Sequence, residues 1–147
     1  MKTVFYDTDR NELYDRLDKL TLDHKPLWGR MTCGQMLAHL TDGVRMTLGE
    51  LAVPPRPGPL RFGPIRHAVI HWLPFPKGAP TAPELLVRRA EDSAVEIGEL
   101  KAAMERMAGR AGEGTWEEHP AFGRMTEHDW GVLVYRHTDH HLRQFGA

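Results

Sequence analysis

The sequence predicts an all-α fold, a four-helix bundle with a long proline-rich connection between its second and third helices. Four segments repeat apolar residues at the three- and four-residue spacing that gives a helix one buried face. Two of these segments follow a threonine whose neighbour three residues later can complete a capping box. A chain of 147 residues is long enough to bury one core, so we predict a single domain over residues 1–147.

The first two helices are predicted from leucine spacing and from capping residues. Leucines recur at helical spacing over residues 9–20, and a proline-containing segment follows them. Thr32 and Gln35 have capping-box spacing, which places the start of the second helix at Thr32. That helix is predicted to end near Gly49, and its broad apolar face includes His39.

The segment after the second helix is rich in proline and cannot be regular throughout. Prolines crowd residues 54–64 and 74–80, and each one lacks a backbone donor. Between them, the apolar piece at residues 65–73 fits a helix of two turns. We interpret the whole region as an ordered connection within one domain.

The last two helices carry the most regular apolar stripes. The third is predicted from Pro83, which suits a first helical turn, to Gly109. The fourth is predicted to start at Thr126, with Asp129 as its capping partner. One face of this fourth helix carries Trp130, Leu133, Val134, His137, His141 and Gln144.

Composition excludes several classes of protein. The formal net charge is −1, from 19 basic and 20 acidic residues, which argues against a nucleic-acid partner. The single cysteine, Cys33, allows no disulfide within the chain, and this fits a reducing, cytoplasmic location. The N-terminus lacks the apolar run of a signal peptide, and no stretch approaches the ~20 apolar residues of a membrane span. The sequence therefore predicts neither secretion nor a membrane partner.

Three of the nine histidines form a candidate metal site. His137 and His141 are four residues apart, so their imidazoles lie on one helical face and can reach one ion. The third ligand must come from another helix, and His39 is the candidate on a core-facing stripe. Three neutral imidazoles leave one coordination position open for water or substrate, as in catalytic zinc sites. The alternative is that such spacing arises by chance in a histidine-rich helix and that these are ordinary polar core residues.

The other candidate ligands are assigned to structural roles. His67 and His71 share the four-residue spacing but are predicted to be surface or loop residues, because they face away from the apolar positions around them. His140 points about 100° away from its neighbour His141 and is predicted to be exposed or supporting. His119 is assigned to loop structure, and Cys33 to a small packed thiol.

Two polar residues could support the triad. Asp42, three residues after His39, could orient its imidazole, but we favour a solvated carboxylate. Gln144 either forms a hydrogen bond near the site or completes the last helix.

The C-terminal run resembles the last helix of DinB-like proteins, a superfamily also called the YfiT or bacillithiol-transferase-like group. Its His-x-x-x-His-x-x-Gln pattern falls on His137, His141 and Gln144, and the single histidine of its second helix falls on His39. Further pieces resemble one of its subfamilies that has no assigned reaction: Trp28–Thr32, Gln35–Leu40, Pro76–Glu84 and His119–Gly123.

This resemblance implies a four-helix bundle with a nickel or zinc ion held by His39, His137 and His141. Some relatives are transferases that use a low-molecular-weight thiol, and the group can dimerise, so a homodimer is a further expectation. Our leading hypothesis is a metal-dependent transferase or hydrolase that acts on a small-molecule substrate. A non-enzymatic metal-binding or sensing bundle and a metal-free interaction protein are the alternatives, because a fold does not transfer a reaction.

Overall fold

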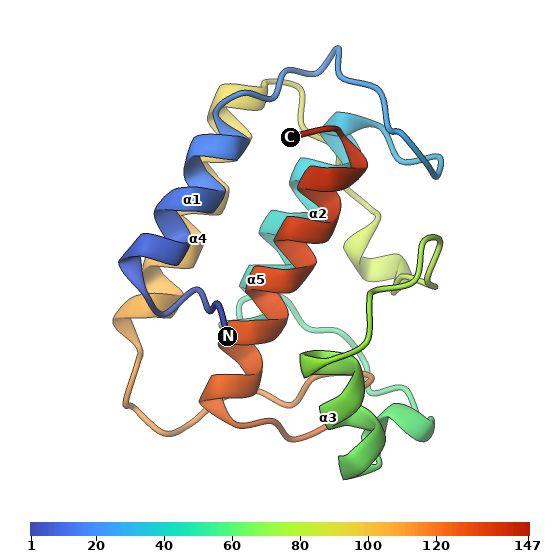
Figure 1. Cartoon of the computed structure of the whole chain (residues 1–147), viewed down its shortest axis with the longest axis vertical. Helices are drawn as coiled ribbons and strands as arrows, with labels where there is room; N and C mark the ends of the chain where they lie inside the picture. Colours follow the sequence, from blue (N-terminus) through green and yellow to red (C-terminus); the bar gives the residue numbers. More distant parts are fainter.

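The computed structural model describes residues 1–147, and its regular structure is helical, with one isolated β-bridge between His119 and Gly123. The bundle consists of the long helices α1 (Asp7–Leu17), α2 (Cys33–Thr47), α4 (Ser93–Gly109) and α5 (Glu127–Gln144). A fifth, shorter helix, α3 (Gly63–His71), lies at one end of the bundle and packs against α5 (Figure 1). The predicted all-α class is confirmed, and the apolar piece between the proline clusters is indeed a helix.

Two helices begin at the predicted capping boxes. The Thr32 hydroxyl accepts a hydrogen bond from Gln35 N (3.2 Å), and the Gln35 side chain accepts one from Thr32 N (2.9 Å). Thr126 and Asp129 form the same reciprocal pair at 3.1 and 3.2 Å. Each box satisfies backbone donors that the first turn leaves free, so it determines where α2 and α5 begin.

Two predicted boundaries were wrong. Helix α1 covers Asp7–Leu17 instead of residues 9–20, and Leu20 is buried from the turn that follows. Helix α4 begins at Ser93 and not at Pro83, because the Asp92 side chain caps it by accepting a hydrogen bond from Val95 N (3.0 Å). The prolines before it leave only a 3₁₀ turn at Pro83–Leu85.

The core lies between the four long helices. Helix α2 packs against α4 and α5, while α1 packs against α5 and α4 (Figure 1). Fully buried side chains from all four meet there: Leu13, Leu17, Met36, Leu37, Leu100, Met104, Trp130 and Leu142. None of the helices combines the length and the apolar composition needed to cross a membrane.

The connection between α3 and α4 is held closely against the first turn of α2. Ala90 N donates a hydrogen bond to the Gly34 carbonyl oxygen (2.8 Å). A Cβ atom at Gly34 would lie only 2.6 Å from the Ala90 carbonyl oxygen, so this approach needs glycine. The connection thereby brings the Pro83–Leu85 turn onto α2, beside His39.

Candidate metal centre

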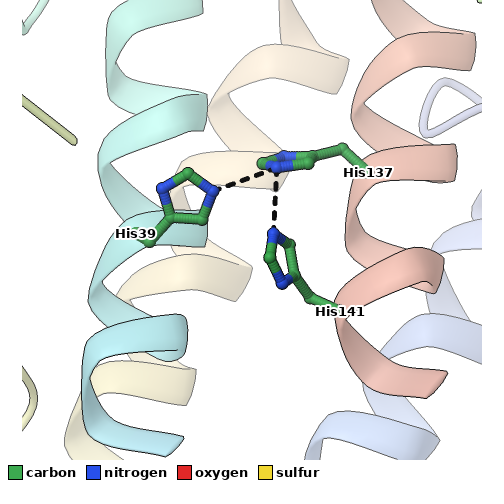
Figure 2. Close-up of side chains that lie close together, drawn as sticks. All are labelled: His39, His137 and His141. Carbon is green, nitrogen blue, oxygen red and sulfur yellow. Dashed lines mark hydrogen bonds between the residues drawn. The ribbon is translucent and has the colours of Figure 1, made fainter. Parts of the chain in front are cut away.

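The three predicted histidines come together inside the bundle. His39 projects from the middle of α2, and His137 and His141 project from successive turns of α5 toward it (Figure 2). His39 is 3% exposed and His141 is 8% exposed, so two of the three imidazoles are removed from water. The helical spacing of the α5 pair and the inward face of α2 account for this meeting.

One nitrogen of each ring points to a common centre. His137 Nε2 lies 3.0 Å from His39 Nε2 and 3.2 Å from His141 Nε2. The ring planes are steeply inclined to one another, at 83°, 75° and 78° for the three pairs. The rings therefore meet edge-on at their Nε2 atoms instead of stacking, as Figure 2 shows.

The tautomer of His39 follows from its second ring nitrogen. His39 Nδ1 lies 3.2 Å from the Leu85 carbonyl oxygen, in the 3₁₀ turn that the connection places beside α2. Because a carbonyl oxygen only accepts hydrogen bonds, Nδ1 carries the proton. The Nε2 atom of the neutral ring then presents a lone pair to the centre.

The tautomer of His141 is set in the same way by Gln144. His141 Nδ1 lies 2.8 Å from Gln144 Oε1. The orientation of the Gln144 amide is defined by its NH₂ group, which donates to the Trp28 carbonyl oxygen (2.9 Å). The amide oxygen therefore faces His141, Nδ1 carries the proton, and Nε2 is again a lone-pair donor. Of the two roles considered for Gln144, the structure supports the hydrogen bond at the site.

Electrostatics keep the cluster neutral at physiological pH. Burial lowers the pKa of His39, although the Leu85 carbonyl and the charge of Asp42 partly oppose the shift. Burial also lowers the pKa of His141 to about 3. The pKa of His137 is held well below its ordinary value by burial and then by the other two imidazoles. Neutral imidazoles are the form that binds metal ions.

The donor set fits a divalent transition metal. The Nε2 atoms of His39 and His141 both direct lone pairs at Nε2 of His137, 3.0 and 3.2 Å away. At most one hydrogen, carried by His137, is available for these two contacts. A cation at the centre would instead accept a lone pair from each of the three nitrogens. Zinc–nitrogen bonds of about 2.0–2.1 Å at tetrahedral angles separate two nitrogen ligands by about 3.3 Å, close to the spacing found here. The hydrogen bonds to Leu85 and Gln144 are of the kind that orients metal-bound histidines.

Aromatic and basic side chains flank the cluster beside α5. The His140 ring lies 5.3 Å from the His141 ring, 5.7 Å from Trp28 and 6.0 Å from Phe75, measured between centroids. The Lys77 ammonium lies 4.4 Å from the centroid of the Trp28 ring. His140 is thus half-buried next to the site, in keeping with a supporting position.

Asp42 neither orients His39 nor lies in solvent, the two roles considered for it from the sequence. Its side chain is buried and does not hydrogen-bond to His39; instead, Arg88 binds both carboxylate oxygens at 2.9–3.1 Å. Arg88 also binds Glu96 on α4 (2.9 Å). The arginine follows Leu85 by three residues, so it ties the turn that contacts His39 to the bundle. Sequence reasoning missed both Leu85, which acts through its backbone, and Arg88, which lies in an irregular segment.

Three further assignments can be compared with the structure. The prediction for His71 was wrong, because its side chain is 6% exposed and pairs with Asp129 of α5, whereas His67 is exposed as predicted. His119 has the loop role assigned to it, since its Nδ1 accepts hydrogen bonds from Ala121 N and Phe122 N. Cys33 is a packed thiol, and burial raises its pKa to about 11.

A family model described as "Protein of unknown function (DUF1569)" matches residues 66–147, which include α5 and two of the three histidines. No curated protein and no solved structure matches the chain significantly.

Proposed function

We propose that this chain, which belongs to the DUF1569 family, binds one divalent metal ion through His39, His137 and His141 and uses it in a transferase or hydrolase reaction. The observation that carries the proposal is the convergence of three Nε2 atoms, two of them with lone pairs directed inward by hydrogen bonds at Nδ1. If the three histidines were ordinary polar core residues, nothing would require hydrogen bonds from Leu85 and Gln144 that turn their Nε2 atoms toward one another.

The DinB-like resemblance supports the same ligand set on separate grounds. Its last-helix pattern and its second-helix histidine fall on these three positions. Imidazole ligands suit zinc and nickel, which are the metals that the resemblance implies. Three protein ligands and one open position are typical of catalytic zinc sites, whereas structural sites have four protein ligands.

A divalent ion held here would act as a Lewis acid toward a small molecule in the open coordination position. The protein contributes a substrate-binding surface beside it, formed by the rings of Trp28, Phe75 and His140. Lys77 adds a positive charge 4.4 Å from the Trp28 ring. Aromatic faces would contact the apolar part of a substrate, and the ammonium would attract an anionic group. This combination supports a small anionic substrate, including a low-molecular-weight thiol cosubstrate, whose soft thiolate suits zinc.

A non-enzymatic metal-binding or sensing bundle is the second candidate. One observation favours it: a catalytic site needs a general base, and no carboxylate contacts any of the three imidazoles. The carboxylate of Asp42, whose charge acts on His39, is already paired with Arg88. Turnover distinguishes the two candidates, and a screen of small thiols with electrophilic acceptors would detect it.

Metal analysis of protein purified without an affinity tag tests the site itself. We expect His141→Ala to lose most of the metal, because one of three ligands is removed. His140→Ala is the matched control, since its ring lies beside His141 without belonging to the group of three ligands, and it should retain the metal. Wild-type protein that neither contains nor takes up zinc or nickel would refute both metal-dependent functions and leave the interaction protein.

A further inference from the structure

A second group of metal-ligating side chains lies at the end of the bundle where α3 meets α5. His67 and His71 are one turn apart on α3, with ring centroids 4.4 Å apart. Asp129, in the first turn of α5, places its Oδ1 atom 2.8 Å from His71 Nε2. One ligand atom from each of these three residues lies within 4.8 Å of the others. We call this group the rim cluster.

The carboxylate of the rim cluster is held in place by its second oxygen. Asp129 Oδ2 accepts the capping hydrogen bond from Thr126 N, which leaves Oδ1 directed at α3. The only ion pair of Asp129 is with His71, so no lysine or arginine neutralises it. A half-buried carboxylate between two imidazoles, without a permanent cationic partner, favours the binding of a cation.

The facing helix is also firmly held. The Arg136 guanidinium of α5 donates to the carbonyl oxygens of Val69, Ile70 and Leu73, at and beyond the end of α3. These bonds fix the position of α3 against α5 independently of any ion. The ligands are therefore brought together by the fold, which reduces the conformational entropy that a cation must overcome on binding.

We propose that the rim cluster is a second, independent metal site, in which His67, His71 and Asp129 bind a divalent ion of the zinc type. Two imidazoles and one carboxylate are an established ligand set for zinc. Asp129 and His137 are eight residues apart on α5, about 12 Å along the helix axis. Metal ions of a binuclear centre lie about 3.5–4 Å apart, so the two sites are separate. The exposed His67 makes this the more accessible and more weakly binding site.

Titration of chelator-treated, untagged protein with Zn²⁺ in a calorimeter tests the proposal, with Co²⁺ absorption spectra as a second readout. We expect two ions per chain for the wild type and one for His67→Ala, a variant at an exposed position that leaves the core intact. His128→Ala is the matched control, because its ring stacks on His71 (13° between planes, 5.6 Å between centroids) without belonging to the cluster. This control should still bind two ions.

The same titration distinguishes a failure of the rim site from a failure of the site at His39, His137 and His141. His141→Ala should lose the tighter ion and keep the weaker one. If His67→Ala and the wild type bind the same number of ions with the same affinities, the rim site is refuted. If the wild type binds a single ion that His67→Ala loses and His141→Ala keeps, the rim site stands and the triad fails. Circular dichroism of each variant confirms that lost binding is not lost folding.

Discussion

His141 Nδ1 lies 2.8 Å from Oε1 of Gln144, one turn further along α5, and the amide of Gln144 is itself anchored to the backbone of Trp28. This relationship determines which nitrogen of the imidazole faces His39 and His137. Other parts of the site also depend on residues that are not ligands themselves but hold the ligands in position. Each of these residues can be tested by substitution.

Replacing Gln144 should weaken metal binding without removing a ligand. In Gln144→Leu, His141 loses its hydrogen-bond acceptor, and we expect metal affinity to fall about 10- to 100-fold, the range found when such supporting partners are removed. Gln144→Glu keeps an acceptor for Nδ1–H and should retain most of the affinity. Calorimetric titration with Zn²⁺ measures both variants, and equal affinities for Gln144→Leu and the wild type would contradict the assigned role.

Arg88 should contribute to stability and to metal binding together. Arg88→Ala leaves the buried Asp42 without its main partner, and breaking a fully buried ion pair costs about 3–5 kcal/mol. We expect about 2 kcal/mol here, because 40% of the Arg88 side chain is exposed and Arg45 lies 3.7 Å from the same carboxylate. Urea unfolding of metal-free protein measures the loss.

The exposed neighbour Arg89 provides the control for this experiment. Arg89→Ala should change the free energy of unfolding by less than about 0.5 kcal/mol. Metal affinity should fall in Arg88→Ala alone, because the Leu85 turn is then held less firmly against His39. Unchanged affinity in Arg88→Ala would show that the turn keeps its position without the ion pair.

Gly34 and Gly98 should respond in opposite ways to the same substitution. A Cβ atom at Gly34 would lie 2.6 Å from the backbone oxygen of Ala90, which cannot move without shifting the connection. We expect Gly34→Ala to destabilise the protein by about 1–3 kcal/mol. At Gly98, within α4, no atom lies within 4 Å of the added methyl group, so Gly98→Ala should stabilise by about 0.5–1 kcal/mol. Chemical denaturation of the two variants in parallel provides the comparison.

Metal-free protein should lose stability as the pH falls below about 6.5, the ordinary histidine pKa. Burial lowers the pKa of His119 to about 4 and that of His141 to about 3, and it lowers the pKa of His39 and His137 as well. Between these values and 6.5, the unfolded chain binds protons that the folded chain does not, so acid favours unfolding. Each such histidine contributes a slope of up to about 1.4 kcal/mol per pH unit.

This pH dependence can be measured by urea unfolding in the presence of a chelator, at several pH values between neutrality and about pH 5. The free energy of unfolding should fall continuously over that range. A value that stays constant would mean that these histidines bind protons in the folded protein over the same pH range as in the unfolded chain, which would contradict the lowered pKa values of the buried imidazoles.

The helices and the α5 half of the triad could be predicted from sequence because they depend on local periodicity. Thr32 and Thr126 cap helices through residues only three positions away, and the side chains of His137 and His141 share a face because of the helical repeat. The predicted start of α4 was wrong because Pro83 suits the first turn of an α-helix as well as it suits the 3₁₀ turn observed.

The sequence by itself therefore determined the all-α class, the caps and the spacing of one histidine pair. Only the tertiary structure decided that His39 meets that pair and that Leu85 and Gln144 orient the rings. It alone also decided that Arg88 forms an ion pair with Asp42 and that His71 lies buried against Asp129. Helical geometry repeats and can be read from nearby residues. The path of a proline-rich connection does not repeat, and it sets which distant groups come into contact.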